Sequence, residues 1–224
     1  MSKLTRGIKG EQIVIDTLND IREYHHLLNN ITLVNRVSKM SHQIDHILIH
    51  PHGIFIIETK NYYGELIYEE NTKQWFKIMD NQKIRISNPL IQNKSHQNEV
   101  YHALKGEYKP ISVVVFVKNN APYFPDENVI NLKDLILFIE SYPYEHKFTN
   151  KTIDKIEKIL NRKNKDISLD EHVTNIKILK TVKREVEQEK SYAIENNKCP
   201  WCDSRIIKEG TLFRCSKCSF RFKL

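Results

Sequence analysis

Residues 43–60, QIDHILIHPHGIFIIETK, contain two short apolar runs on either side of a Pro-His-Gly turn. Both runs are rich in β-branched residues, so the stretch predicts two antiparallel strands joined as a hairpin. If the Pro-His pair forms the tip of the hairpin, Asp45 lies opposite Glu58. Side chains alternate along a strand, and Glu58 and Lys60 therefore point to the same face.

Two carboxylates on neighbouring strands repel each other unless they share a proton or a cation. Mg²⁺ prefers oxygen ligands and commonly binds one or two carboxylates together with a substrate phosphate. Lys60 could steady or deprotonate an attacking water and offset phosphate charge. Asp45, Glu58 and Lys60 therefore suit hydrolysis of a phosphodiester, although a cluster of surface ion pairs at a strand end is the alternative.

The rest of the first two thirds of the chain predicts a mixed α/β domain. The nearly continuous apolar run over 111–117, interrupted only by Ser112, is typical of a central strand that is buried on both faces. Asn88 and Pro89 are a favourable start for a helix, because Asn caps free N–H groups and Pro suits the first helical position. Patterns of apolar residues predict helices over 7–23, 89–104, 132–139 and 153–160 and further strands over 32–37, 65–68, 74–79 and 83–86.

Polar residues on two of the predicted helices are further candidates for the site. Glu11 lies on the apolar stripe formed by Ile8, Ile15, Leu18 and Ile21, where an unpartnered carboxylate is costly. Gln92 and His96 are four residues apart and share one helix face. The alternatives are an exposed acid favoured by the helix dipole for Glu11, and a solvated face for the other two.

Four sequence blocks together resemble the nuclease-related domain family. They are Gly7-x-x-Gly10-Glu11, Gln43-x-Asp45-His46-Ile47, the segment from Gly53 to Gly64 that contains Glu58-x-Lys60-Asn61-Tyr62, and Asn88-Pro89-x-x-Gln92. That family is similar to the PD-(D/E)xK phosphodiesterases, which implies a restriction-endonuclease-like fold with a mixed central sheet flanked by helices.

The resemblance also implies roles for individual residues. Asp45 and Glu58 would bind Mg²⁺ or Mn²⁺ with the Thr59 carbonyl as a third ligand, and Lys60 would be the catalytic lysine. Glu11 would be a helix-borne acid near the metal, and Gln92 a polar residue close to the metal or the phosphate. His46, His50 and His52 do not share one face, so a zinc site with the carboxylates is not expected.

All four cysteines lie near the C-terminus as two Cys-x₂-Cys pairs separated by twelve residues, namely Cys199, Cys202, Cys215 and Cys218. This spacing supplies four thiolates for one tetrahedral Zn²⁺. The segment resembles the zinc ribbons of type IA topoisomerases. Iron in place of zinc and a pair of redox dithiols are the alternatives. Its aromatic residues, Trp201, Phe213, Phe220 and Phe222, could stack on bases or could form the core of the ribbon.

Charge divides the chain unevenly. Residues 1–146 carry 16 basic and 17 acidic side chains, whereas residues 147–224 carry 19 and 11. The expected domains are a nuclease-like domain over 1–145, a helical connector over 146–196 and a zinc ribbon over 197–224. The basic C-terminal third could bind phosphates, or its lysines could simply cover a solvated surface.

The expected partner is nucleic acid, DNA in the first place, with a possible protein partner for the apolar stripe of the connector. No apolar run exceeds five residues and the first residues lack the apolar region of a signal peptide, so a cytoplasmic protein without a membrane partner is expected. The sequence favours a metal-dependent nuclease. The alternatives are a nucleic-acid-binding module without turnover and an adaptor that recruits a partner.

Overall fold

The computed structural model describes residues 3–35, 38–62, 65–79, 81–118, 126–144, 146–165, 184–218 and 220–224. The chain divides into two compact units, residues 1–166 and 167–224. Within the described residues, no helix is both long enough and apolar enough to cross a membrane.

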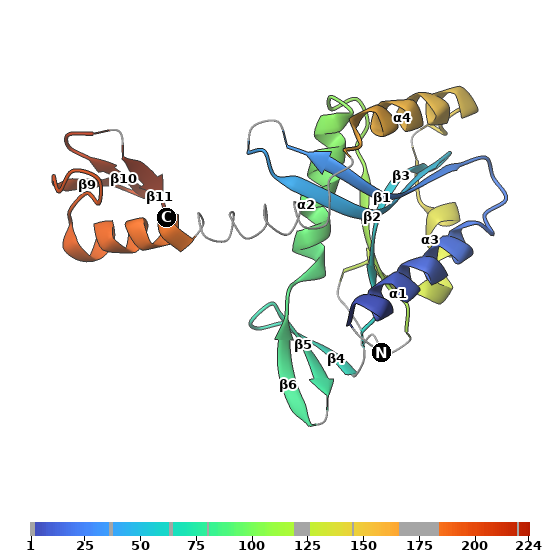
Figure 1. The fold of residues 1–224 in the computed structure, drawn as a ribbon, viewed down its shortest axis with the longest axis horizontal. Coiled ribbons are helices and arrows are strands. Elements are labelled where there is room, and N and C mark those ends of the chain that lie inside the picture. Colours follow the sequence, from blue (N-terminus) through green and yellow to red (C-terminus); the bar gives the residue numbers. More distant parts are fainter. Residues whose placement is uncertain are drawn as a thin grey trace. The chain divides into compact units, whose positions relative to one another are not determined.

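The first unit is built on a mixed five-stranded sheet with the order β1-β2-β3-β7-β8 (Figure 1). β2 is antiparallel to both β1 and β3, and β3, β7 and β8 are parallel. The expected burial of the apolar run is confirmed for residues 113–116 of β7, an interior strand, but the middle strand of the sheet is β3. The strands are β1 (His26–Val34), β2 (Ser41–His50), β3 (Gly53–Lys60), β7 (Ile111–Phe116) and β8 (Val129–Asn131).

Helices cover both faces of this sheet (Figure 1). One core lies between the sheet and α2 and α4, and includes Ile54, Ile56, Val100 and Ile156. The other core lies between the sheet and α1 and α3, and includes Val14, Leu18, Phe55 and Ile139. The helices are α1 (Lys3–Leu18), α2 (Pro89–Ala103), the short 3₁₀ helix η1 (Leu132–Asp134), α3 (Leu135–Ser141) and α4 (Asn150–Lys163).

A separate antiparallel sheet, β4-β5-β6, lies in sequence between β3 and α2. Trp75 of this sheet stacks on Phe116 of β7 with the ring centroids 6.0 Å apart. Its strands are β4 (Glu65–Glu69), β5 (Gln74–Met79) and β6 (Gln82–Ile86).

α2 begins as its sequence predicts. The Asn88 side chain accepts a hydrogen bond from the N–H of Leu90, and Pro89 is the first helical residue. Further along the helix, the buried amide of Asn93 donates to the carbonyls of Ile56 (2.8 Å) and Val113 (2.9 Å). A single side chain thereby ties α2 to both β3 and β7.

Three expectations about the first unit are wrong in detail. α1 ends at Leu18 rather than residue 23, and Ile8 is 59% exposed because Gly10, Val14 and Leu18 form the buried side of the helix. β1 begins at His26 rather than at residue 32 and continues through Asn30, which tolerates the positive φ of 53°.

The expected boundary at residue 145 lies too early. α4 belongs to the first unit because Ile153, Ile156 and Leu160 are buried against Ile31 and Leu33 of β1. Most of the expected apolar stripe of the connector, from Val173 to Val182, lies outside the described residues; the following residues 184–196 are helical.

The second unit contains this helical segment and a three-stranded antiparallel sheet with the order β11-β10-β9. Its strands are β9 (Ile206–Glu209), β10 (Leu212–Cys215) and β11 (Arg221–Lys223). Phe213, Phe220 and Ala193 are buried together with Cys199 and Cys215, so two of the four aromatic residues form a small core. Trp201 remains 59% exposed.

Candidate nuclease and metal sites

The hairpin of β2 and β3 has the predicted register. His46 pairs with Ile57 and Ile49 pairs with Ile54, and one more step in this register puts Asp45 opposite Glu58. The backbone ladder stops before that step. Instead, the Thr59 N–H donates a 2.8 Å hydrogen bond to Oδ2 of Asp45. The carboxylate of Asp45 is therefore fixed against the end of β3.

Glu58 is the most deeply buried carboxylate of the site, with 2% of its surface exposed. Lys60 Nζ donates a hydrogen bond to its Oε1 and lies 3.3 Å from Oε1 of Gln92. On the other side, Nδ1 of His96 lies 3.4 Å from Oε2 of Glu58. α2 thus brings Gln92 and His96 to the carboxylate and the lysine from successive turns of one helix face.

The solvated helix face that the sequence left open for His96 is wrong, because only 6% of this residue is exposed. Its ring also packs edge-on against His42, with centroids 6.0 Å apart. Gln92 is exposed, but it contacts Lys60. The helical spacing suggested that both could reach one site, but the burial of His96 depends on how α2 docks and could not be derived from that spacing.

α1 reaches the site through a close contact between Gly10 and the side chain of Asn61. A Cβ built on Gly10 would lie 2.7 Å from Cβ of Asn61, so only glycine allows this approach. Nδ2 of Asn61 also donates a hydrogen bond of 2.9 Å to the carbonyl oxygen of Arg6. One residue after Gly10, Glu11 is half-buried and interacts electrostatically with Glu58 and Lys60.

Burial and charge perturb the acids in different directions. Burial and the charge of Glu58 raise the pKa of Asp45 to about 7, against the opposing hydrogen bond from Thr59. Burial and Glu58 also raise the pKa of Glu11. Burial alone would raise the pKa of Glu58, but its contacts with His96 and Lys60 leave that pKa below its ordinary value. Asp45 therefore carries the proton that the crowded carboxylates share.

Burial lowers the pKa of Lys60, but the charges of Glu58, Tyr62 and Asp45 and the hydrogen bond to Glu58 together outweigh it and leave the pKa raised. Lys60 is accordingly an ammonium ion, with three donors and no acceptor. In this form it can offset the charge of a phosphate and orient oxygen atoms, but it cannot accept a proton.

The donor set fits a hard divalent cation. Oε2 of Glu58 is buried and makes no hydrogen bond to any residue that the structure describes; its contact with Nδ1 of His96 is 3.4 Å long. Burial and the charge of Glu58 raise the pKa of Asp45 beside it, and a cation would offset both effects. Oxygen atoms in this arrangement are the ligands that Mg²⁺ or Mn²⁺ prefers.

Thr59 is held from the opposite face of the sheet. The buried His46 lies between Asn29 and Thr59, with its Nδ1 2.8 Å from Oδ1 of Asn29 and its Nε2 3.1 Å from Oγ1 of Thr59. Burial lowers the pKa of His46 to about 4, so the ring is neutral. The neutral ring can donate to Asn29 and accept from the Thr59 hydroxyl, which orients the residue whose N–H binds Asp45.

His50 and His52 lie at the other end of the hairpin. Nε2 of His50 lies 3.3 Å, and Nε2 of His52 lies 3.9 Å, from Oε2 of Glu23. His50 and His52 thus share one environment, with ring centroids 5.1 Å apart, whereas His46 lies apart from them and contacts Thr59.

A groove of about 1210 Å³ in the first unit also lies away from the carboxylates of the site. It is lined by residues at the starts of β3 and β7 and along α2, including His52, Gly53 and Ile111, and by neither Glu58 nor Lys60.

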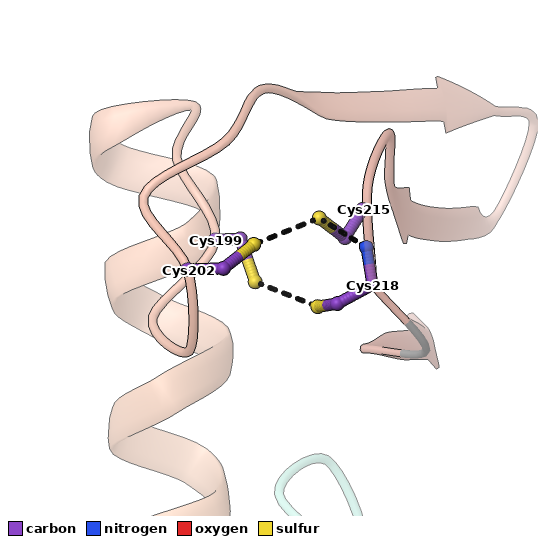
Figure 2. A group of neighbouring side chains, drawn as sticks. All are labelled: Cys199, Cys202, Cys215 and Cys218. Atoms are coloured by element: carbon purple, nitrogen blue, oxygen red, sulfur yellow. Dashed lines mark hydrogen bonds between the residues drawn. The ribbon is translucent and has the colours of Figure 1, made fainter.

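The second unit brings the four cysteines together (Figure 2). Their sulfur atoms all lie within 4.8 Å of one another, with Sγ–Sγ distances of 3.6 Å for Cys199 and Cys218 and 3.4 Å for Cys202 and Cys215. Four thiolates around a tetrahedral Zn²⁺ with Zn–S bonds of about 2.3 Å would be about 3.8 Å apart. No other group of three or more potential His, Cys, Asp or Glu ligands is this close among the described residues.

Backbone N–H groups surround these sulfur atoms. Those of Lys217 and Cys218 each lie 3.3 Å from Sγ of Cys215, and that of Trp201 lies 3.4 Å from Sγ of Cys199. Such donors stabilise thiolate over thiol, which is the form that binds a metal. The four cysteines could therefore hold one metal ion.

Comparisons with known proteins support the resemblance of the first unit to the nuclease-related domain family. The family model of the nuclease-related domain matches residues 6–117. An uncharacterized protein of Bacillus anthracis is 29% identical over 166 residues, which cover 71% of this chain and 77% of the relative. No solved structure matches the chain. The matched residues include the hairpin and the whole of α2 with Gln92 and His96, and the chain belongs to the nuclease-related domain family.

Proposed function

We propose that the first unit is a metal-dependent nuclease that hydrolyses phosphodiester bonds in DNA, on a restriction-endonuclease-like fold. The observation that carries the proposal is the convergence of Asp45, Glu58 and Lys60 at the end of one hairpin, with Glu58 buried and lacking a hydrogen bond at Oε2. Membership of the nuclease-related domain family supports the same chemistry.

Each residue has a distinct part in this proposal. Asp45, Glu58 and the Thr59 carbonyl would hold Mg²⁺ or Mn²⁺, which when bound supplies positive charge to the scissile phosphate. The Lys60 ammonium would donate to a phosphate oxygen and offset its charge. Gln92 accepts from Lys60 and so directs the ammonium, whereas His96 fixes the carboxylate of Glu58 from the other side. Glu11 adds negative charge next to the cation.

The four cysteines would hold Zn²⁺ in a ribbon that takes no part in the chemistry. Four-thiolate sites leave no open position for a substrate. The ribbon would instead increase the affinity for DNA, for which its excess of basic residues is suited; residues 197–224 carry seven basic and two acidic side chains.

A cleavage assay tests the proposal. The full chain is incubated with linear duplex, nicked duplex and single-stranded DNA in the presence of Mg²⁺, Mn²⁺ or neither. Glu58→Gln should abolish cleavage and weaken Mg²⁺ binding. Lys60→Met should abolish cleavage while Mg²⁺ still binds, because Lys60 is not a ligand.

Glu107→Gln is the matched control, because Glu107 is an exposed glutamate of the same unit that pairs only with neighbours such as Lys155. This variant should cleave as the wild type does. Absence of cleavage by the wild type, with DNA binding intact, would favour the binding module without turnover. Cleavage by the Lys60→Met variant at the wild-type rate would contradict the assigned site.

A further inference from the structure

The sheet of the second unit has two unlike faces. Phe213 pairs with Lys208 on β9 and with Phe222 on β11, and this face carries the buried residues next to the cysteines. The opposite face is formed by the alternate residues, and we refer to it as the outer face. It consists of Ile207 and Glu209 on β9, Leu212 and Arg214 on β10, and Arg221 and Lys223 on β11.

Like charges meet directly across two strands of the outer face. Arg214 is paired in register with Arg221, and Lys223 is two residues further along the same strand. All three are exposed. Like charges at directly opposed positions of an antiparallel pair destabilise the sheet. A fold of this size keeps such an arrangement at a cost in stability, which a function on this face would explain.

The outer face offers little compensation for these charges. Arg214 binds Oε1 of Glu209 through both Nε (3.1 Å) and Nη2 (2.6 Å). Among the described residues of the chain, no carboxylate lies within ion-pairing distance of Arg221 or Lys223. Glu209 also holds the guanidinium of Arg214 in a fixed orientation, so the face presents one oriented and two free cations.

We propose that the outer face binds the phosphate backbone of nucleic acid, with Arg221 and Lys223 as direct phosphate contacts and Arg214 oriented by Glu209 beside them. Three exposed cations on two adjoining strands can contact phosphates of one backbone, and such contacts carry no sequence information. The inference rests on the proposed function only for the identity of the substrate, since it concerns binding by the second unit and not cleavage by the first.

Charge reversal separates binding from stability. Arg221→Glu places a carboxylate opposite Arg214, which should leave the melting temperature of the second unit unchanged or raise it. The same change should weaken binding to nucleic acid by roughly tenfold or more at low salt. If Arg221 had only a structural role, its replacement would not weaken binding to nucleic acid while the second unit became equally or more stable.

Lys208→Glu is the matched control. Lys208 is also exposed and on the same sheet, but it lies at a register position of the other face, with Nζ 5.4 Å from the centre of the Phe213 ring. It changes the net charge of the chain by the same amount. Under the proposal it should lower affinity much less than Arg221→Glu.

The measurement is fluorescence anisotropy with the full, zinc-loaded chain and two labelled duplexes of unrelated sequence, together with one of the single strands, over a range of salt concentrations. Ca²⁺ replaces Mg²⁺ to limit cleavage. The wild type should bind all three probes, and Arg221→Ala should reduce the slope of log affinity against log salt by about one.

Equal losses for the Arg221→Glu and Lys208→Glu variants would overturn the proposal, because net charge alone would then explain binding. Unchanged affinity of Arg221→Glu would overturn it as well. If the proposed nuclease activity is wrong, the wild type will bind DNA but will not cleave it in Mg²⁺. The cleavage assay therefore distinguishes a failure of the proposed function from a failure of the proposed binding face.

Discussion

Thr59 and Asp45 are joined by a hydrogen bond of 2.8 Å from the backbone N–H of Thr59 to Oδ2 of Asp45, at the point where the ladder between β2 and β3 ends. A side chain thus takes the place of the next backbone acceptor. The carboxylate is fixed beside Glu58 although burial and repulsion disfavour its charge. The stability of this arrangement depends on pH and on cations.

Asp45→Asn should stabilise the protein in Mg²⁺-free buffer. The folded-state pKa of Asp45, about 7, lies above the ordinary aspartate value of 3.8, so the folded state binds more protons and stability falls as pH rises between these values. The advantage of the variant should be near zero at pH 4 and reach on the order of 2–4 kcal/mol above pH 8. Denaturant unfolding at several pH values measures it; a constant difference would contradict the shift. Mg²⁺ should stabilise only the wild type.

Gly10→Ala and Gly7→Ala form a matched pair on α1. The added Cβ at position 10 meets Asn61 at 2.7 Å and forces the helix away from β3, whereas at position 7 the nearest atom is Oε1 of Glu11 at 4.0 Å. Gly7→Ala should gain up to about 1 kcal/mol from helix propensity. Gly10→Ala should lose about 1–3 kcal/mol from overpacking and reduce cleavage by moving Glu11. Calorimetry and the cleavage assay check both; similar effects at the two positions would exclude the close contact as the cause.

Glu11→Gln should reduce cleavage without destabilising the fold. Burial and the charge of Glu58 raise the pKa of Glu11, so removal of its charge relieves repulsion in the absence of metal. The expected melting temperature in Mg²⁺-free buffer is unchanged or slightly higher, while the Mg²⁺ concentration needed for half-maximal cleavage increases. Activity equal to that of the wild type at all Mg²⁺ concentrations would make Glu11 a partly exposed acid without a role in the site.

Thr59→Val should weaken Mg²⁺ binding by about tenfold, with little effect on unfolding. The variant keeps the shape of the side chain and the N–H that binds Asp45, but removes the hydroxyl that contacts His46. Titration calorimetry with Mg²⁺ measures the affinity. Thr72→Val, in an exposed turn, is the control. If the two variants bind Mg²⁺ equally well, His46 only fills space beneath the site.

One zinc ion per chain should be found by elemental analysis, and Cys218→Ser should lower this content and unfold the second unit. A segment this small cannot bury enough apolar surface to fold without metal. The first unit should keep its melting transition, because its two cores contain none of the cysteines. Iron in place of zinc would change the identity of the metal, and a melted first unit would contradict the independence of the two units.

The sequence was sufficient for elements whose partners are close along the chain. The register of β2 and β3 follows from a tight turn, and the start of α2 follows from Asn88 and Pro89. The orientation of α2 does not follow from hydrophobic periodicity, because the helix buries the polar residues Asn93, His96 and Gln97. α4 shows a clear apolar stripe, but its docking on β1 depends on contacts more than a hundred residues apart.

The double hydrogen bond of Asn93 to Ile56 and Val113 also bears on how the chain folds. Residues 61–110 separate β3 from β7, so this parallel pairing must close a long loop before it gains any contacts, and such steps are slow. Asn93 lies within that loop and reaches both strands at once, so docking of α2 and closure of the loop become one cooperative event. Refolding should therefore be limited by this crossover, and the α2 face that carries Gln92 and His96 docks at the same moment as β7 joins the sheet.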